Sequence, residues 1–267
     1  MSNRIKQEFI EKSEPVRLNK FLSEAGACSR READRLIENG KVTVDGKVAT
    51  MGMKVTPDQV VKVNGKAANK VEDMVVLAVN KPRGIVCTEE KREKNNIIKF
   101  LNYPTRITYA GRLDKDSRGL LIMTNNGDII NKMMRAGNCH EKEYKVTVDK
   151  EITPAFLKNM SEGVPILDTV TRPCKVEKIG KYTFKIILTQ GLNRQIRRMC
   201  EALGYKVRDL YRIRIMNIEI GDLKEGKTRR LTDKELEGLY ELIKDSSNET
   251  VKYKKNFANE KVKYKKR

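Results

Sequence analysis

The apolar residues of this chain come in short runs, which limits the folds that it can form. Three examples are MVVLAV at 74–79, LLIMTN at 120–125 and YTFKIILT at 182–189. Their lengths are typical of β-strands, and none approaches the roughly 18–20 residues of a membrane span. Further strand candidates lie at 143–149 and 212–220, and helical spacing occurs at 128–135, 154–161, 193–203 and 233–243. Because strands and helices mix without strict alternation, we expect an α+β fold with a largely antiparallel sheet.

The segment 15–72 has a compact pattern of its own. Two short helices are predicted, and Ser29 opens the second with Glu32 at the capping-box position. The dipeptides DG at 45–46 and NG at 64–65 are strong signals for tight hairpin turns between short strands. We therefore expect a minor domain made of a helix pair and a small hairpin sheet.

The remaining parts of the chain differ in composition. Residues 73–248 hold the other strand and helix candidates and are expected to form a second, larger domain. Residues 1–14 are polar and mostly unpatterned, so we expect a disordered arm. Residues 249–267 are rich in lysine and lack a core pattern, which predicts a basic disordered tail.

The charge of the chain indicates a polyanionic partner. Lys and Arg number 56 against 36 Asp and Glu, a formal net charge of +20. Clustered cations gain free energy by releasing the counterions condensed on phosphate backbones. Five cations lie on or beside the N-terminal helix pair: Arg17, Lys20, Arg30, Arg31 and Arg35. From the residues alone, this group is either an RNA contact or an ordinary solvated helix face.

Several classes of chemistry have no motif in this sequence. The 5 cysteines are scattered without a CxxC pair and the chain has 1 histidine, so we expect reduced thiols in or near the core and no metal site. Neither a phosphate-binding GxxxxGK[ST] loop nor a dinucleotide-binding GxGxxG loop occurs. The first residues lack an apolar signal-peptide core, so we expect a cytoplasmic protein with no membrane association.

The segment AGRLDKDSRGLLIMTNNGD at 110–128 concentrates residues that can carry chemistry. Asp114 and Asp116 precede a strand candidate. A carboxylate on a loop next to a strand end can act as a nucleophile or a base, and nearby cations favour its charged form. Asp and Gly in a loop are more often simply turn residues.

The segment TQGLNRQIRRMCEALGY at 189–205 predicts a helix with two distinct faces. Ile196, Met199 and Leu203 form an apolar stripe. Three arginines share another face: Arg194, Arg197 and Arg198. Such a cluster requires an anion to offset its repulsion, and RNA phosphate and the Asp114 carboxylate are the candidates.

These motifs resemble two known families. RLNKFLSEAGACSRREADRLIENGKVTVDGK at 17–47 is similar to the αL-type RNA-binding domain of ribosomal protein S-four. GRLD at 111–114, followed by S-x-GLL-x-x-TN-x-GD, resembles the catalytic motif of the RsuA/RluB/RluE/RluF family of RNA pseudouridine synthases. The second resemblance extends over about 15–245 and implies a catalytic domain at 73–248.

The resemblance also implies roles for individual residues. Asp114 matches the catalytic aspartate, which attacks the ribose of the target uridine or abstracts a proton from it. Arg112 matches the residue that occupies the space of the flipped nucleotide, and Tyr144 matches the tyrosine that stacks on the target base. Arg197 matches an arginine that pairs with the catalytic aspartate. By the same resemblance, Arg194, Arg198 and the five N-terminal cations are expected to bind RNA.

The substrate is implied at a finer level by RAGNCHEKEY at 135–144, which resembles the RluF subgroup. It implies isomerisation of a uridine in 23S ribosomal RNA, with a tyrosine tRNA as a possible second substrate. No metal or organic cofactor is expected, because exchanging one glycosidic bond for another needs no external energy. A monomer is the default. The alternatives are a paralogue that modifies another 16S or 23S uridine and a ribosome-associated RNA-binding protein without activity.

Overall fold

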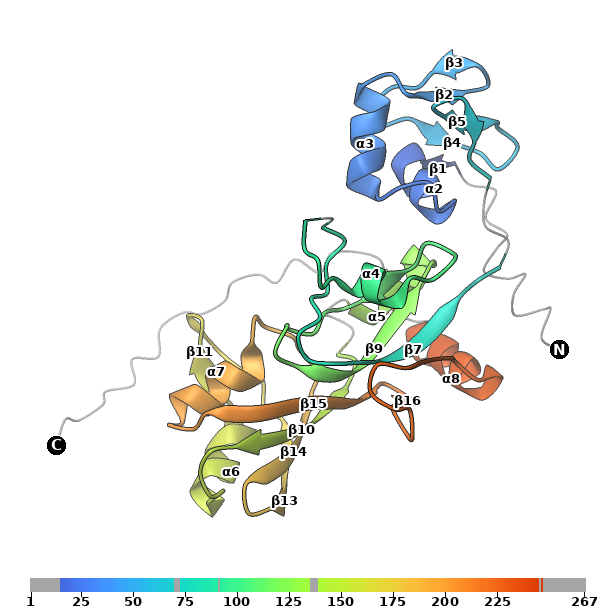
Figure 1. The fold of residues 1–267 in the computed structure, drawn as a ribbon. Helices are drawn as coiled ribbons and strands as arrows, with labels where there is room; N and C mark the ends of the chain where they lie inside the picture. Colours follow the sequence, from blue (N-terminus) through green and yellow to red (C-terminus); the bar gives the residue numbers. More distant parts are fainter. Residues whose placement is uncertain (1–14, 70–72, 91, 135–138, 245, 247–267) are drawn as a thin grey trace.

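The computed structural model describes residues 15–69, 73–90, 92–134, 139–244 and 246, and Figure 1 shows their arrangement. The N-terminal domain is a helix pair packed on short strands. Its elements are β1 (Val16–Arg17), α2 (Leu18–Glu24), α3 (Arg30–Glu38), β2 (Val42–Val44), β3 (Lys47–Val48), β4 (Lys54–Val55), β5 (Val61–Val63) and β6 (Lys66–Ala67). Leu18, Leu22, Ala33 and Ile37 from the helices are buried against valines of the strands.

Local signals explain how this small domain folds. The Ser29 hydroxyl accepts a hydrogen bond from the backbone N–H of Glu32 at 3.2 Å, which caps α3 as predicted. Asp45 and Gly46 have φ values of 50° and 81° in the turn between β2 and β3. Two consecutive positive φ values match the right-handed twist of a hairpin, and glycine adopts the second at no steric cost.

A nine-stranded sheet forms the centre of the larger domain, in the order β13-β14-β10-β15-β9-β7-β17, with β16 paired to β15 and β8 paired to β9. The strands are β7 (Val76–Lys81), β8 (Thr108–Ala110), β9 (Arg118–Thr124), β10 (Lys142–Val148), β13 (Lys175–Gly180), β14 (Thr183–Leu188), β15 (Val207–Ile215), β16 (Ile218–Glu219) and β17 (Thr228–Arg230). All its pairs are antiparallel except β9 with β15. The predicted α+β class with a largely antiparallel sheet is therefore confirmed.

Helices pack on both halves of this sheet. They are α4 (Ile97–Leu101), α5 (Gly127–Met134), α6 (Pro154–Glu162), α7 (Gln195–Ala202) and α8 (Asp233–Ile243), and a separate hairpin joins β11 (Pro165–Ile166) to β12 (Thr169–Val170). Residues of α5 and α8 share one core with β7 and β9. Residues of α6 and α7 share another with β10 and β14. The two halves meet where β9 lies beside β15, which places the ends of several elements together.

Gly119 is required at that junction. Its φ is +109°, and a Cβ atom there would collide with the backbone of Arg212 on β15. Glycine alone permits both this backbone conformation and this close approach. The loop that ends at β9 is therefore held directly against β15.

The structure differs from the sequence-based prediction at several elements. The single strand predicted at 212–220 is β15 followed by the short β16, because Met216 turns the chain with a φ of 53°. The polar strands β13 and β17 and the short helix α4 had no pattern that predicted them. Cys139 is exposed rather than near the core. The arm at 1–14 and the tail at 249–267 lie outside the described residues.

Candidate active site

A cavity of about 610 Å³ lies between the two halves of the larger domain. The loop from Gly111 to Ser117 forms one wall, and the segment 188–196 forms another. Lys142 and Tyr144 of β10 and Arg212 of β15 also line it. The structure thus brings the predicted residues Arg112, Asp114, Tyr144 and Arg194 into one cavity, although they are up to 82 positions apart in the chain (194 − 112).

The loop that carries Asp114 is held by hydrogen bonds on both sides. The Asp114 carbonyl accepts from the N–H of Ser117 at 3.1 Å, and the Lys115 carbonyl accepts from the N–H of Gly84 at 2.8 Å. Leu113 is buried, and its N–H points to the Cys87 sulfur at 3.5 Å. The Asp114 side chain is 34% exposed, so it is both anchored through its backbone and open to a ligand.

The arginine that contacts the Asp114 carboxylate is not the one that the resemblance implied. Arg194 Nη1 lies 3.5 Å from the Asp114 carboxylate and 3.9 Å from that of Asp116. Arg197 instead donates from Nη2 to the Asp116 carbonyl at 3.0 Å and to the Ser117 hydroxyl at 3.3 Å. Arg194 precedes α7 with a φ of 50°, which turns it away from the helical face expected for it. In this structure Arg194 pairs with Asp114, and Arg197 holds the loop.

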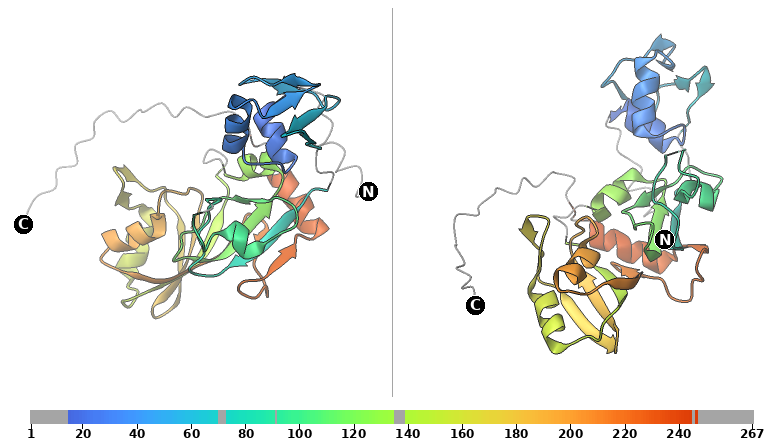
Figure 2. Two further views of the ribbon diagram at one scale, coloured as in Figure 1. Left: turned by 45° about the horizontal axis from the view of Figure 1, so that its top comes forward. Right: turned by 60° about the vertical axis from the view of Figure 1, so that its left-hand side comes forward.

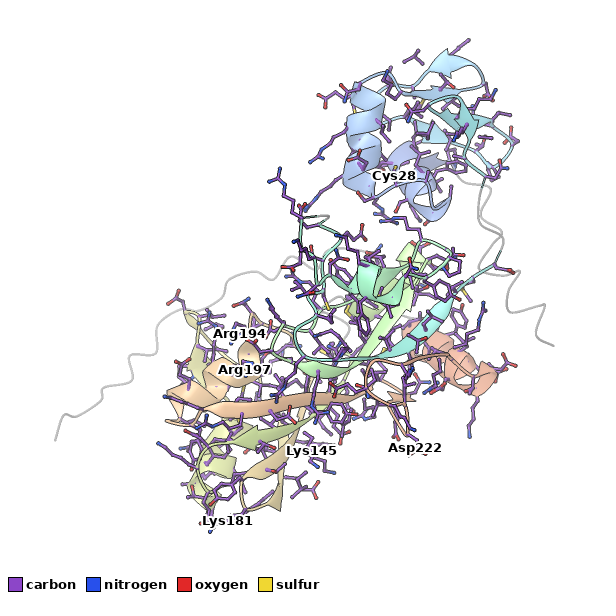
Figure 3. The ribbon with its side chains drawn as sticks, viewed as in Figure 1. Cys28, Lys145, Lys181, Arg194, Arg197 and Asp222 are labelled. Carbon is purple, nitrogen blue, oxygen red and sulfur yellow. The ribbon has the colours of Figure 1, made fainter. Side chains whose placement is uncertain are left out.

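Arg198 makes only local contacts. Its guanidinium donates to the Asn193 carbonyl at 3.1 Å and to the Asn193 side chain at 3.3 Å. It is partly exposed at the start of α7, close to the segment that lines the cavity. Figure 3 shows Arg194 and Arg197 at the same end of α7. The three arginines thus have separate contacts and do not form one face.

A β-bulge places Tyr144 and Arg212 together. Glu143 pairs with Arg214, but Tyr144 pairs with Arg212, so Ile213 is the extra residue in β15. Directly opposed residues of antiparallel strands point to the same face. Without the bulge, an isoleucine would face Tyr144 in place of the arginine.

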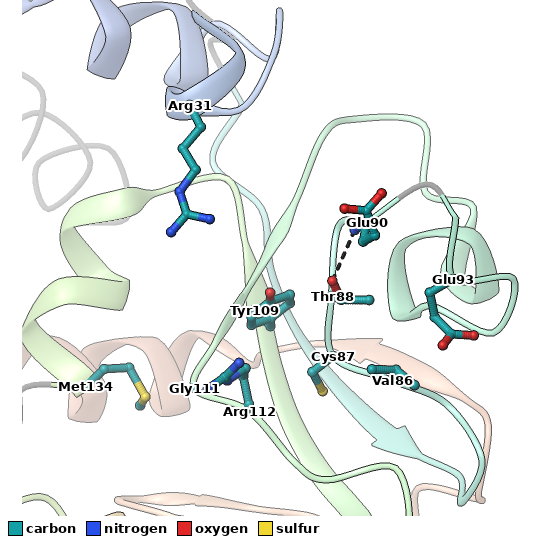
Figure 4. Close-up of a pocket in the computed structure, with 10 residues that line it drawn as sticks. All are labelled: Arg31, Val86, Cys87, Thr88, Glu90, Glu93, Tyr109, Gly111, Arg112 and Met134. Carbon is teal, nitrogen blue, oxygen red and sulfur yellow. Dashed lines mark hydrogen bonds between the residues drawn. The ribbon is translucent and has the colours of Figure 1, made fainter. Parts of the chain in front are cut away.

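Arg112 connects this cavity to a second one of about 820 Å³. Arg112, Gly111, Cys87, Val86 and Met134 line both, so the cavities adjoin. Figure 4 shows Arg31 reaching from α3 of the N-terminal domain toward this second cavity. A continuous hollow surface therefore runs from the N-terminal domain to Asp114.

The N-terminal domain contacts the larger domain through ion pairs and hydrogen bonds, and Figure 2 shows it beside α5. Lys20 Nζ lies 3.0 Å from the Asp128 carboxylate, and Arg106 Nη1 donates to the Ser23 hydroxyl at 3.3 Å. Lys20, expected to bind RNA, is thus engaged within the protein. The other cations of the helix pair, Arg17, Arg30, Arg31 and Arg35, are exposed, and Arg35 pairs with Glu32 at 3.4 Å.

Three buried or half-buried cations near Asp114 were not singled out from the sequence. Lys81 is fully buried and donates to the carbonyls of Pro82 and Ile85, both at 2.8 Å. Burial, followed by the charge of Arg212, lowers the pKa of Lys142 to about 8. Arg212 is 2% exposed. The available signals were that Lys142 lies in HEKEY, beside a recognised motif, and that Lys81 follows the apolar run at 74–79; Arg212 begins the strand candidate at 212–220 and had no such signal.

Metal binding and membrane insertion have no structural support in the described part of the chain. Residues 15–69, 73–90, 92–134 and 139–244 contain no cluster of His, Cys, Asp and Glu suited to a metal ion. Over those ranges, no helix combines the length and the apolar character needed to span a bilayer.

Comparison with known proteins identifies the family. Residues 75–202 match the RNA pseudouridylate synthase family, and residues 16–61 match the S4 domain family. The chain is 57% identical over 236 residues to the dual-specificity RNA pseudouridine synthase RluF of Escherichia coli (strain K12), which covers 88% of this chain and 81% of the relative. The chain belongs to the RNA pseudouridine synthase family. It is thus an isomerase that converts uridine in RNA to pseudouridine.

Two further comparisons extend this result. The synthase is 37% identical over 242 residues to the ribosomal large subunit pseudouridine synthase B of Bacillus subtilis (strain 168), covering 87% of this chain and 98% of that one. A crystal structure of a pseudouridylate synthase superimposes with a TM-score of 0.63 at 28% identity, over 84% of this chain and 99% of the other. These matches include both domains, so the N-terminal domain is part of the conserved architecture of the relatives.

Proposed function

We propose that this synthase modifies a uridine in large-subunit 23S ribosomal RNA and that a tRNA is a second substrate. One relative is named as a ribosomal large-subunit enzyme, which supports the 23S substrate, and another as a dual-specificity RNA enzyme, which supports a second RNA substrate. The observation that carries the proposal is the adjoining pair of cavities, with Arg31 at one end and Asp114 at the other. The enzyme acts as a monomer in the cytoplasm, where ribosomes are assembled.

Asp114 is proposed as the catalytic residue. Its carboxylate attacks C1′ of the target ribose, or removes a proton from the ribose, and the N1–C1′ bond breaks. The uracil then turns and C5 bonds to C1′, which displaces the Asp114 carboxylate in the first route, whereas in the second route the proton returns to the ribose. C5 loses its proton and N1 takes one up, so the net reaction is an isomerisation. Arg194 Nη1, which lies 3.5 Å from the carboxylate, orients it toward the ribose.

Substrate binding requires the uridine to leave its stack, because the ribose in a folded RNA is not accessible to a side chain. Arg112 lies at the boundary of the two cavities, where it can fill the space left by the extruded nucleotide. Tyr144 stacks on the base, which contributes roughly 1–3 kcal/mol. Arg31, Arg194 and Arg198 contact phosphates around the site. Arg197 is proposed to position the loop of Asp114, and Lys20 to hold the two domains together.

The experiment that tests this proposal is a tritium-release assay with 23S transcript labelled at C5 of uridine. We expect release from the wild-type enzyme and none from Asp114→Ala. Mapping the modified uridine by carbodiimide-dependent reverse-transcription stops, in RNA from a strain lacking the gene, identifies the site. Release only from 16S transcript would favour a paralogue with another target. Equal release from Asp114→Ala and wild type would remove Asp114 from the reaction.

A further inference from the structure

Two cations in the candidate active site that are not exposed, Lys142 and Arg212, have no carboxylate partner among the described residues. Lys142 Nζ donates to one acceptor, the His140 carbonyl, at 3.3 Å. Arg212 donates to the carbonyls of Leu120 at 2.7 Å and Arg112 at 3.5 Å, and its Nη2 atom is buried with no hydrogen-bond partner. An ammonium group has three N–H donors and a guanidinium has five, so both groups have donors to spare.

Burying a charge without an opposite charge beside it destabilises the fold, so these two cations are expected to have a function that offsets this loss. The opposite face of the same strand pair shows the ordinary arrangement: Arg214 bonds to Glu141 at 2.9 Å and Glu143 at 2.8 Å. Lys142 and Arg212 line the cavity, whereas the acidic partners lie on the other face. Asp114, which lines the same cavity, pairs with Arg194, so a ligand can supply the negative charge that Lys142 and Arg212 lack.

The bulge in β15 concentrates these donors around Tyr144. Lys142 and Tyr144 are two positions apart on β10 and so share a face. The bulge at Ile213 puts Arg212 opposite Tyr144 on that face. A base that stacks on the Tyr144 ring thus lies within the reach of donors from both strands.

We propose that Lys142, supported by Arg212, binds a carbonyl oxygen of the target uracil and stabilises the negative charge that this base acquires as its N1–C1′ bond breaks. This inference rests on the proposed function. The bonding pair of the N1–C1′ bond moves onto the uracil, where it is shared between N1, O2 and O4. The pair returns to C1′ when C5 attacks it, and loss of the C5 proton with uptake of one proton at N1 completes the isomerisation without an oxidant or a co-reactant. Fixed donors aimed at a developing charge are a large source of rate enhancement.

The same donors select the base. Lysine and arginine side chains have hydrogen-bond donors and no acceptors. Uracil presents acceptors at O2 and O4, whereas cytosine presents an amino group at position 4, which would meet another donor. Discrimination against cytosine thus follows when the donor contacts position 4, whereas O2 is common to both bases.

The first test uses single-turnover rates and RNA affinities of Lys142→Met, with Lys145→Met as the matched control. Lys145 lies three positions along β10, is exposed and points to the other face, away from Arg194 and Arg197 (Figure 3). We expect Lys142→Met to lower the rate about 10²–10³-fold, with the RNA Kd changed by less than about threefold, and Lys145→Met to react as wild type. Lys142→Arg, which keeps the charge, should recover part of the rate.

The second test asks whether Lys142 acts through a base oxygen. RNA with 2-thiouridine or 4-thiouridine at the target position replaces one carbonyl oxygen with a weaker acceptor. One of the two substitutions should slow the wild type by about tenfold and Lys142→Met by much less, since the contact is already lost. A lysine with only a structural role would give equal effects in both enzymes.

The outcomes separate this inference from the proposed function. An inactive wild type on both 23S transcript and tRNA would contradict the proposed function. An active wild type with Lys142→Met within threefold of it would overturn the inference alone. An inactive Lys142→Met with no coupling to either thio substitution would also overturn it, and thermal unfolding of that variant shows whether the loss is due to the fold.

Discussion

Replacing Arg197 with methionine tests whether this residue holds the catalytic loop. The methionine keeps most of the aliphatic packing and removes three hydrogen bonds: at 3.0 Å to the Asp116 carbonyl, at 3.3 Å to the Ser117 hydroxyl and at 3.5 Å to the Val207 carbonyl. Ser117 is 1% exposed, so its hydroxyl would lose this bond with little access to water. A hydrogen bond from a charged donor contributes about 1.5–3 kcal/mol, and the two longer ones contribute less.

The expected loss for Arg197→Met is therefore about 2–3 kcal/mol of unfolding free energy. In a domain of this size each 1 kcal/mol lowers Tm by about 2–4 °C, so Tm should fall by roughly 4–12 °C. Release of the loop also displaces Asp114, and a misplacement of about 1 Å costs about 10²-fold in rate. Thermal unfolding and single-turnover tritium release measure the two effects.

The control is Arg198→Met, the next residue on the same helix, which bonds only to Asn193. We expect its Tm to stay within about 1 °C of wild type, because its bonds are local and partly exposed. A double-mutant cycle with Asp114→Asn then separates two models of Arg197. If Arg197 positions the loop, the coupling free energy between Arg197 and Asp114 in the unfolding of the free enzyme should be small. If Arg197 forms a direct ion pair with Asp114, this coupling free energy should be large. An unchanged Tm in Arg197→Met, with a rate within threefold of wild type, would refute the reasoning.

Three further predictions follow from other contacts. Gly119→Ala should destabilise the fold by about 3 kcal/mol, because the residue has a φ of +109° and a Cβ would collide with the β15 backbone; an unchanged Tm would contradict this. Lys20→Met removes a partly exposed ion pair to Asp128 and should lower the free energy of unfolding by at most about 1 kcal/mol. Small-angle scattering should show a larger radius of gyration for this variant. A double variant that exchanges the charges of Lys20 and Asp128 should restore the wild-type radius. The reaction rate of the wild type should fall above pH 8 as Lys142, whose pKa is lowered to about 8, loses its proton, and in Lys142→Arg this fall should be absent. The pKa of Lys142 is about 8 in the folded protein and the usual 10.5 in the unfolded chain. Between these two values the unfolded chain binds more protons, so the titration of Lys142 makes the free energy of unfolding rise with pH. The loss of rate above pH 8 therefore cannot result from unfolding caused by this group.

Much of the secondary structure could be predicted because its signals are local. The capping box at Thr232 and Glu235 was visible in the sequence and forms at the start of α8. The apolar run at 74–79 becomes β7, whose six residues are all buried. The strands β13 and β17 were missed because edge strands expose much of their surface and need few apolar residues.

The contacts of the candidate site were harder to predict. Spacing placed Arg194 on a helical face with Arg197, but Arg194 has a φ of 50° and lies just before the helix. A single residue in the left-handed region reverses the direction of a side chain, and no hydrophobic pattern reports it. The pairing of Arg194, rather than Arg197, with Asp114 was therefore visible only in the folded chain.

The sequence by itself determined the class of the fold, the two families and the segments that carry the chemistry, because turn residues, apolar spacing and short motifs are properties of neighbouring residues. Only the tertiary structure decided which arginine meets Asp114, that Lys20 joins the two domains, and that Lys142 and Arg212 face the cavity without an acidic partner. Arg212 faces the cavity because β15 has one extra residue, Ile213, which puts Arg212 on the same face of the sheet as Tyr144 of β10. Such a shift of register arises from the pairing of distant strands, and pairing is a property of the whole sheet.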